Sequence, residues 1–143
     1  MTDSNLRQSL SAFTVSTHFV RLLTEYAAAS GLVVSPWLQA NGVDPATLDD
    51  PDGRIAFADY DVLLNDLAAQ LTEPHIGLRL GQTARLAHLG TSGLAQMACS
   101  TVQELLPRMA RYNSLIMDAF EDDLEVVGNE LILHWRRRIP DPV

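Results

Sequence analysis

The chain of 143 residues carries a formal net charge of −8, contains no lysine and has one cysteine, Cys99. That length suits a single domain with one hydrophobic core, and 47% hydrophobic residues are ordinary for a soluble globular protein. The acidic balance disfavours binding to nucleic acid or anionic lipid, the missing lysine excludes Schiff-base and P-loop chemistry, and the single cysteine excludes an internal disulfide.

The first third of the chain combines a polar lead-in with two predicted helices. Residues 1–15 show no sustained period and are predicted to be a flexible lead-in. Apolar residues three and four apart predict a long helix over residues 17–31. The serine–proline pair that opens residues 35–42 is typical of a helix start and predicts a short helix, which Gly42 ends. The Asp-, Pro- and Gly-rich residues 44–53 predict a connecting loop.

The middle of the chain repeats this pattern. The same apolar spacing predicts a second long helix over residues 58–71. Glu73-Pro74 ends that helix and begins a short one, which Gly81 closes. Gly90 and Gly93 are expected to flank a turn before a small-residue helix over residues 94–98.

The last third predicts a third long helix and a hairpin. Ser100 and Gln103 form a capping-box pattern at the start of a helix whose apolar stripe continues to Phe120, and Pro107 is expected to bend it. The period then changes to two on either side of a Gly-Asn turn at residues 128–129, which predicts a β-hairpin through Trp135.

An ordered set of short motifs resembles one family of regulators. The stretch from Pro74 to Asn113, PHIGLRLGQTARLAHLGTSGLAQMACSTVQELLPRMARYN, is similar to part of the N-terminal effector-sensing domain of AraC/XylS-type bacterial transcription regulators, in the subfamily whose sensor is mostly helical rather than a cupin barrel. The match spans residues 17–135 in the family's order. Its other pieces are Gly31-Leu32, Asn41-Gly42-Val43-Asp44, Arg54-Ile55 and Glu73.

The resemblance implies a sensor and dimerisation domain over residues 16–143. Such a domain binds a small effector, forms a homodimer and biases an attached DNA-binding domain with two helix-turn-helix units. That second domain is absent from this chain, so direct DNA binding by the chain is not expected. In the family, further strands follow the hairpin, and an exposed hairpin edge is expected to favour pairing with a second copy.

Six aromatic and sulfur-containing side chains are the candidate lining of an apolar effector pocket, and plain core positions are the alternative. They are Trp37, Tyr60, Met97, Met109, Tyr112 and Met117. A sensor also needs two arrangements that the effector distinguishes. We expect the domain to change between these arrangements at the bend at Pro107 and at a linker after Trp135.

Other candidate sites have simpler explanations. Residues 27–38 imitate a helix-turn-helix, but the second helix offers only Gln39 and Asn41 to DNA, which favours an ordinary helical corner. The four histidines lack the spacing of metal ligands, so neither a metal nor a cofactor is expected. The carboxylates fit solvated faces, which predicts no enzyme activity, and the run at residues 136–138 is interpreted as a solvated exit from the domain.

Together these patterns predict a single α+β domain, helix-dominated, with three long amphipathic helices and a C-terminal β-hairpin. Without a secretory signal or a membrane-length apolar run, it is expected to be cytoplasmic and free of the membrane. The alternative function is a stand-alone helical protein-interaction adaptor without a small ligand. A reading frame that continues past Val143 into a basic helical region would favour the regulator, and a stop codon the adaptor.

Overall fold

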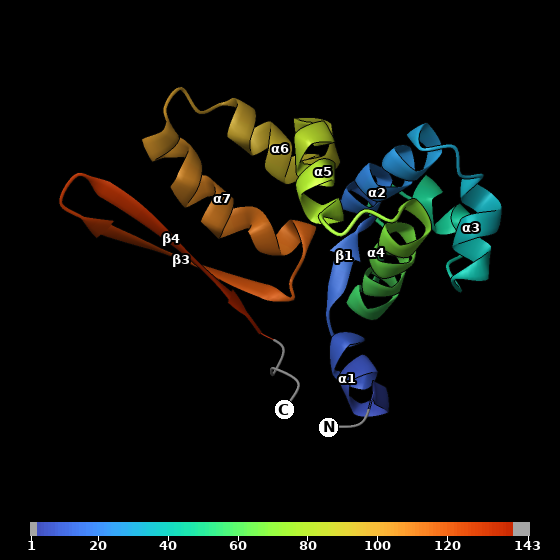
Figure 1. Ribbon diagram of the computed structural model, residues 1–143. Helices are drawn as coiled ribbons and strands as arrows, with labels where there is room; N and C mark the ends of the chain where they lie inside the picture. Colours follow the sequence, from blue (N-terminus) through green and yellow to red (C-terminus); the bar gives the residue numbers. More distant parts are fainter. Residues whose placement is uncertain (1–2, 139–143) are drawn as a thin grey trace.

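The computed structural model describes residues 3–138, with side chains from residue 7 onward, and confirms the helix-dominated α+β class. Its helices precede a C-terminal antiparallel hairpin (Figure 1). The helices are α1 (Asp3–Leu10), α2 (Thr17–Ala29), α3 (Val34–Ala40), α4 (Phe57–Leu71), α5 (Ile76–Thr83), α6 (Gly90–Met97) and α7 (Val102–Ile116), with 3-10 turns η1 (Pro45–Asp49) and η2 (Leu86–Leu89). The strands are β1 (Thr14–Ser16), β2 (Arg54–Ala56), β3 (Phe120–Val127) and β4 (Glu130–Arg137).

The hydrophobic core lies between α2, α3, α4 and the small β1–β2 sheet. Leu23 of α2, Leu38 of α3 and Leu63 and Leu67 of α4 are at most 1% exposed, because each helix turns its apolar stripe toward the others. The C-terminal part is packed more loosely. Ile116 is the one buried side chain of α7. After it, Ala119 is the one buried residue among those described, and the half-buried Met117 and Phe120 pack against the core.

Most of residues 3–16 form regular structure, although the sequence there shows no sustained period. Asp3–Leu10 form α1, and Thr14–Ser16 form β1, which pairs antiparallel with β2. Val15 is fully buried opposite Ile55. A three-residue strand is stabilised by its partner and its core contacts, and a partner some forty positions away leaves no local period to detect.

Two predicted helix starts are displaced. The short helix begins at Val34 with Val33 as N-cap, and no side chain caps it, so Ser35 is already inside the helix. At α7 the cap is Thr101, whose hydroxyl accepts a hydrogen bond from the Glu104 N–H (3.2 Å). Glu104 Oε2 accepts from the N–H of Ser100, the residue before the cap (2.8 Å), so the cap lies one residue later than expected and the two hydrogen bonds do not form a reciprocal pair.

The two glycines expected to flank a turn lie inside α6 instead. Gly90 is its first residue and has φ +55°, a conformation that favours glycine. Gly93 is buried where α6 crosses η2: a Cβ on Gly93 would lie 2.0 Å from the Leu86 carbonyl oxygen. Gly93 therefore allows two backbones to approach closely.

The C-terminal hairpin is confirmed and is longer than expected. The third long helix ends at Ile116 rather than at Phe120, and β3 starts at Phe120. The turn lies at Gly128-Asn129, with Gly128 at φ +60°. Because β4 continues to Arg137, Trp135 lies within a strand and no linker follows it directly. Pro107 lies inside α7, as expected.

Candidate functional site

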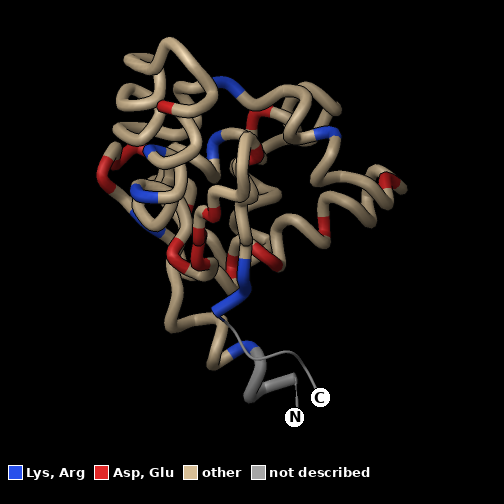
Figure 2. The backbone as a smooth tube through the Cα atoms, turned by 90° about the vertical axis from the view of Figure 1, so that its left-hand side faces the viewer, with Lys and Arg blue, Asp and Glu red and all other residues tan. Residues whose placement is uncertain are grey.

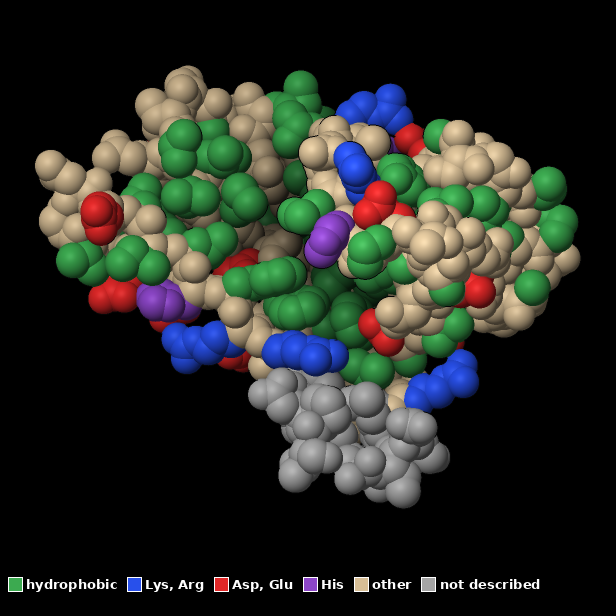
Figure 3. Space-filling view, viewed as in Figure 1, with side chains coloured by type: hydrophobic (Ala, Val, Ile, Leu, Met, Phe, Trp, Pro, Cys, Tyr) green, Lys and Arg blue, Asp and Glu red, His purple; other side chains and the backbone are tan. Residues whose placement is uncertain are grey.

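An apolar cavity of about 350 Å³ lies between the α2–α4–α5 body and the part formed by α7 and the hairpin. Figure 3 shows a hollow lined by hydrophobic side chains at the centre of this face. Its volume falls within the range of about 300–1,000 Å³ that small-molecule sites occupy. The lining residues are Phe19, Leu22, Phe57, Tyr60, Leu64, Gly77, Leu80, Gly81, Ala84, Leu89, Asn113, Ile116, Met117, Phe120 and Trp135.

Five aromatic rings in contact form one wall of the cavity. Phe19 of α2 meets Tyr60 of α4, with ring centroids 5.9 Å apart, and Tyr60 meets Phe57 at 6.3 Å. Phe57 makes an edge-to-face contact with Phe120 of β3 at 6.0 Å, and Phe120 stacks on Trp135 of β4 at 4.3 Å. The rings therefore connect the helical body to the hairpin without a break, at separations typical of favourable aromatic pairs.

Three of the lining residues carry a polar side-chain group, namely the Tyr60 hydroxyl, the Asn113 amide and the Trp135 indole N–H. The Tyr60 side chain is buried, and its hydroxyl forms no hydrogen bond with a described residue although it still reaches accessible space. The half-buried Asn113 side-chain amide is likewise without a described partner. Burial raises the pKa of Tyr60 above its ordinary value, so at neutral pH its hydroxyl is protonated and can donate a hydrogen bond.

The small residues of α5 form the mouth of the cavity. Gly77, Leu80, Gly81 and Ala84 recur at helical spacing and line the cavity together. A Cβ placed on Gly77 or Gly81 would meet no atom within 4 Å, so neither glycine is required for close packing of the backbone. Opposite them, Trp135 remains 62% exposed. The missing side chains leave the cavity open.

The segment that leaves α7 is bonded to the N-terminal sheet directly beside the cavity. Met117, a lining residue, forms an antiparallel bridge with Val15. The next residue, Asp118, accepts two hydrogen bonds from Thr14, one from the backbone N–H (2.6 Å) and one from the hydroxyl (3.0 Å). A displacement of α7 relative to the body would have to move or break this junction.

Arg54 of β2 strengthens the same junction. Its guanidinium donates to the carbonyl oxygens of Leu115 (2.6 Å) and Ser114 (3.5 Å) in the last turn of α7. A cation is favourable there because the last carbonyls of a helix carry partial negative charge. Arg54 Nη2 also lies 3.9 Å from the Asp118 carboxylate.

Of the six residues proposed from the sequence, two line this cavity: Tyr60 and Met117. Trp37 is buried on the far side of the core, where its indole N–H donates to Asp66 (2.7 Å). Met97 is 65% exposed on α6. Met109 and Tyr112 are half-buried on α7 and lie outside the lining set; the Arg111 guanidinium lies 5.6 Å from the Tyr112 ring centroid.

Sequence reasoning did not select four of the aromatic rings and the glycine mouth. Phe19 and Phe57 occupy ordinary stripe positions of α2 and α4, while Phe120 and Trp135 belong to the hairpin. Nothing in their spacing shows that the four rings meet. The Gly77/Gly81 spacing of four on a helical segment was a usable local pattern, since it leaves one helix face without side chains.

A polar cluster next to the cavity fixes η2 to α2. His88 is 4% exposed, and its Nδ1 accepts a hydrogen bond from the Arg85 N–H (3.0 Å). Its Nε2–H therefore donates to the Glu25 carboxylate (3.2 Å), which also pairs with the Arg85 guanidinium. Desolvation raises the pKa of Glu25, but the hydrogen bonds from His88 and Arg85 and the charge of Arg85 outweigh it, so this pKa lies below its ordinary value.

We expect the Glu25 cluster to make stability depend on acid pH. A carboxylate with a depressed folded-state pKa stabilises the fold above its unfolded pKa, near the ordinary 4.5, and this stabilisation is lost as pH falls through the folded pKa. In urea unfolding, the stability difference between wild type and Glu25→Gln should be constant above pH 4.5 and shrink below it. The Glu130→Gln control, at an exposed carboxylate without a described ion pair, should give a flat difference.

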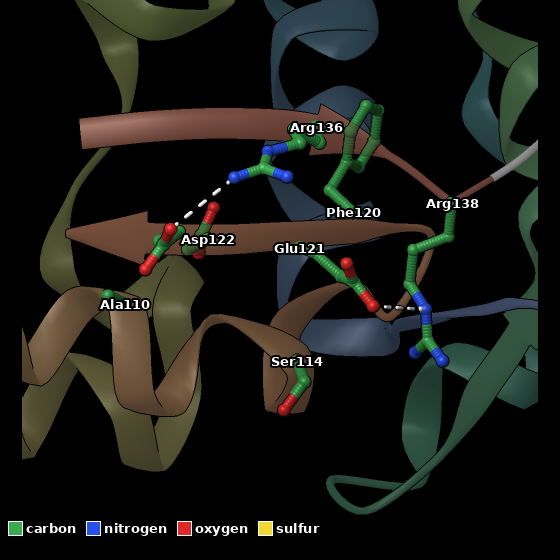
Figure 4. A pocket seen from close by; sticks show the side chains of 8 residues that line it. Ala110, Ser114, Phe120, Glu121, Asp122, Arg136 and Arg138 are labelled. Carbon is green, nitrogen blue, oxygen red and sulfur yellow. Dashed lines mark hydrogen bonds and ion pairs between the residues drawn. The ribbon is translucent and has the colours of Figure 1, made fainter. Parts of the chain in front are cut away.

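A second pocket, of about 360 Å³, lies between α7 and β3 and is polar (Figure 4). Across the hairpin, Arg136 pairs with Asp123 (3.4 Å) and Arg138 with Glu121 (3.5 Å). Asp122 Oδ1 is buried and has no hydrogen-bond partner in the described chain. The charges of this pocket thus largely neutralise one another within the hairpin, and such exposed pairs contribute little to stability.

The remaining features give no sign of a metal or nucleic-acid site. Figure 2 shows basic positions dispersed along the chain, apart from the run at residues 136–138. Within residues 3–138 no group of three or more His, Cys, Asp or Glu residues is placed to hold a metal ion. Among the described helices, none combines the length and apolar character needed to cross a bilayer.

The helix-dominated α+β fold contains an apolar cavity, and sequence comparison identifies the family. The model of the N-terminal arabinose-binding domain of AraC transcription regulators matches residues 31–143. The chain belongs to this family. The members of this family are regulatory domains of transcription regulators, and the family is not a class of enzymes.

Individual relatives agree with this assignment. Uncharacterized HTH-type transcriptional regulators of Mycobacterium tuberculosis and Mycobacterium bovis are each 35% identical over 96 residues, covering 66% of this chain and 28% of theirs. The ornithine utilization regulator of Pseudomonas aeruginosa is 27% identical over 110 residues, covering 77% of this chain and 32% of that protein. The chain thus matches about a third or less of the length of these relatives.

Proposed function

We propose that this domain senses a small effector in the apolar cavity and thereby controls a helix-turn-helix domain attached to it in a full-length cytoplasmic regulator. The observation that carries the proposal is the position of the cavity, whose walls come from the helical body and from the α7–hairpin part together. Family membership supports a sensing role in transcription regulation.

The position of the cavity suggests how binding is transmitted. An effector that contacts Tyr60 on one side and Phe120 on the other favours whichever arrangement of the two parts lets both contacts form. The hydrogen bonds of Asp118 to Thr14 and of Arg54 to the end of α7 then hold or release that arrangement. Because α7 leads directly into the hairpin, its displacement moves the C-terminal end of the domain.

The proposal is tested with the purified chain in a thermal-shift screen of acids, amino acids, sugars and uncharged apolar compounds. A ligand at 100 times its Kd stabilises the folded state by about 2.7 kcal/mol, which is readily measured. We expect a concentration-dependent rise in Tm for one chemical class. A protein in which this domain is joined to a helix-turn-helix domain should then respond to the same compounds in a promoter-reporter assay.

The main alternative is a domain that acts by self-association or as an adaptor, without a ligand. Both strands of the isolated hairpin have an unpaired edge, and Val126, Ile132 and Trp135 are exposed on it, which supports a homodimer. Sedimentation of the same sample separates the cases. Absence of any thermal shift, together with a concentration-dependent dimer, would replace ligand sensing by dimerisation.

A further inference from the structure

We infer that the effector is an uncharged, predominantly apolar molecule with a single hydrogen-bond acceptor, which the Tyr60 hydroxyl and the Asn113 amide recognise. This inference rests on the proposed function and narrows it to a chemical class. It departs from the sugar in the family's description and from the amino acid in the name of the Pseudomonas relative.

The described lining of the cavity is uncharged, which indicates an uncharged effector. None of the described residues that line the cavity is acidic or basic. A carboxylate or ammonium group entering it would lose its hydration and gain no ion pair, and such a loss is prohibitive for an unpaired charge. An amino acid with a charged side chain would bring three such groups. The lining therefore favours an uncharged effector.

The small number of polar groups carries the second step. A sugar presents a hydroxyl on nearly every carbon, and each buried hydroxyl needs a partner. Among the described lining residues, three side chains carry a polar group, namely Tyr60, Asn113 and Trp135, while five aromatic rings form one wall. Apolar sites of this kind use a few polar groups to orient a ligand that is held mainly by burial of apolar surface.

The geometry of Tyr60 carries the third step. Its hydroxyl is the one polar atom on the aromatic wall apart from the indole nitrogen of Trp135, and it has no described protein partner. Because no described protein group bonds to this hydroxyl, it is free to donate a hydrogen bond to an acceptor on a ligand in the cavity. Asn113, on α7, brings an amide donor to the same cavity from the other part of the domain.

The test uses two matched fluorescent probes on the purified chain. Prodan, 6-propionyl-2-(dimethylamino)naphthalene, is uncharged and carries one ketone acceptor, whereas 6-(dimethylamino)-2-naphthoate carries a carboxylate in place of the ketone. We expect prodan to bind with blue-shifted emission and the naphthoate to bind at least about tenfold more weakly. L-arabinose and L-ornithine should not displace prodan.

Two variants distinguish recognition by the Tyr60 hydroxyl from non-specific binding of the dye. Tyr60→Phe should weaken prodan binding by about three- to tenfold, the fold-change of one lost hydrogen bond. Tyr26→Phe should leave binding unchanged, because Tyr26 is a half-buried tyrosine of α2 that does not line this cavity. Urea unfolding of each variant verifies that the fold is retained.

The outcomes distinguish this inference from the proposed function. Equal or tighter binding of the naphthoate, or displacement of prodan by arabinose or ornithine, overturns the ligand class and leaves a ligand-sensing cavity. An unchanged prodan affinity in Tyr60→Phe overturns the role of the hydroxyl. If neither dye binds and no compound in the thermal-shift screen raises Tm, the proposed function fails together with the inference.

Discussion

Replacing Gly93 with alanine should destabilise the domain by about 2–4 kcal/mol, the upper part of the range for overpacked core positions. The added Cβ would lie 2.0 Å from the Leu86 carbonyl oxygen and 2.9 Å from its carbonyl carbon. Both are backbone atoms, so no side-chain rotation relieves the overlap. Helix α6 must instead move away from η2, which Arg85 and His88 hold against α2.

The matched control is Gly77→Ala on α5, where a Cβ meets no atom within 4 Å. Glycine costs a helix conformational entropy, so this change should stabilise the domain by about 0.5 kcal/mol. Urea unfolding, followed by circular dichroism, measures both variants on one scale. Equal stabilities for the two variants would mean that α6 and η2 are not packed as the structure places them.

Much of the fold could be predicted from the sequence, because the information that specifies it is local. The stripes of α2, α4 and α7 repeat every three to four residues, and one turn at Gly128-Asn129 with alternating neighbours is sufficient to predict the hairpin. In each case the residues that specify the element lie within it. The N-caps at Val33 and Thr101 lie one or two residues from the predicted caps, so local patterns locate a helix boundary only to within a residue or two.

What could not be predicted depends on pairs of residues far apart in the chain. The β1–β2 sheet exists because Val15 meets Ile55 and both enter the core. The sequence predicts Gly93 beside a turn, where glycine often occurs. In the structure it is needed because any side chain there would overlap the backbone of Leu86. A single sequence specifies neither contact, since each depends on how finished elements pack.

The candidate site was predicted only in part for the same reason. Tyr60 and Met117 line the cavity, whereas Trp37 has the same chemical character but is buried against Asp66. Residue type alone does not distinguish them. The wall depends on Phe57 meeting Phe120, a contact across sixty-three positions of sequence that no periodicity encodes.

Replacing Gly81 with leucine should abolish ligand binding and leave the fold intact. Gly81 lies at the mouth of the cavity, and a Cβ there meets no atom within 4 Å, so the leucine side chain extends into the space facing the aromatic wall. Leucine also favours helix over glycine by up to about 1 kcal/mol. The variant should therefore unfold at an equal or higher urea concentration than wild type.

The contrast between stability and binding makes this variant decisive. A ligand present at 100 times its Kd stabilises wild type by about 2.7 kcal/mol, and we expect no stabilisation of Gly81→Leu by the same compound. Gln82→Leu is the matched control: it adds the same side chain one position further along α5, at an exposed residue outside the lining. It should keep full binding. Ligand binding that survives in Gly81→Leu would place the effector elsewhere, because the leucine side chain obstructs the mouth of this cavity.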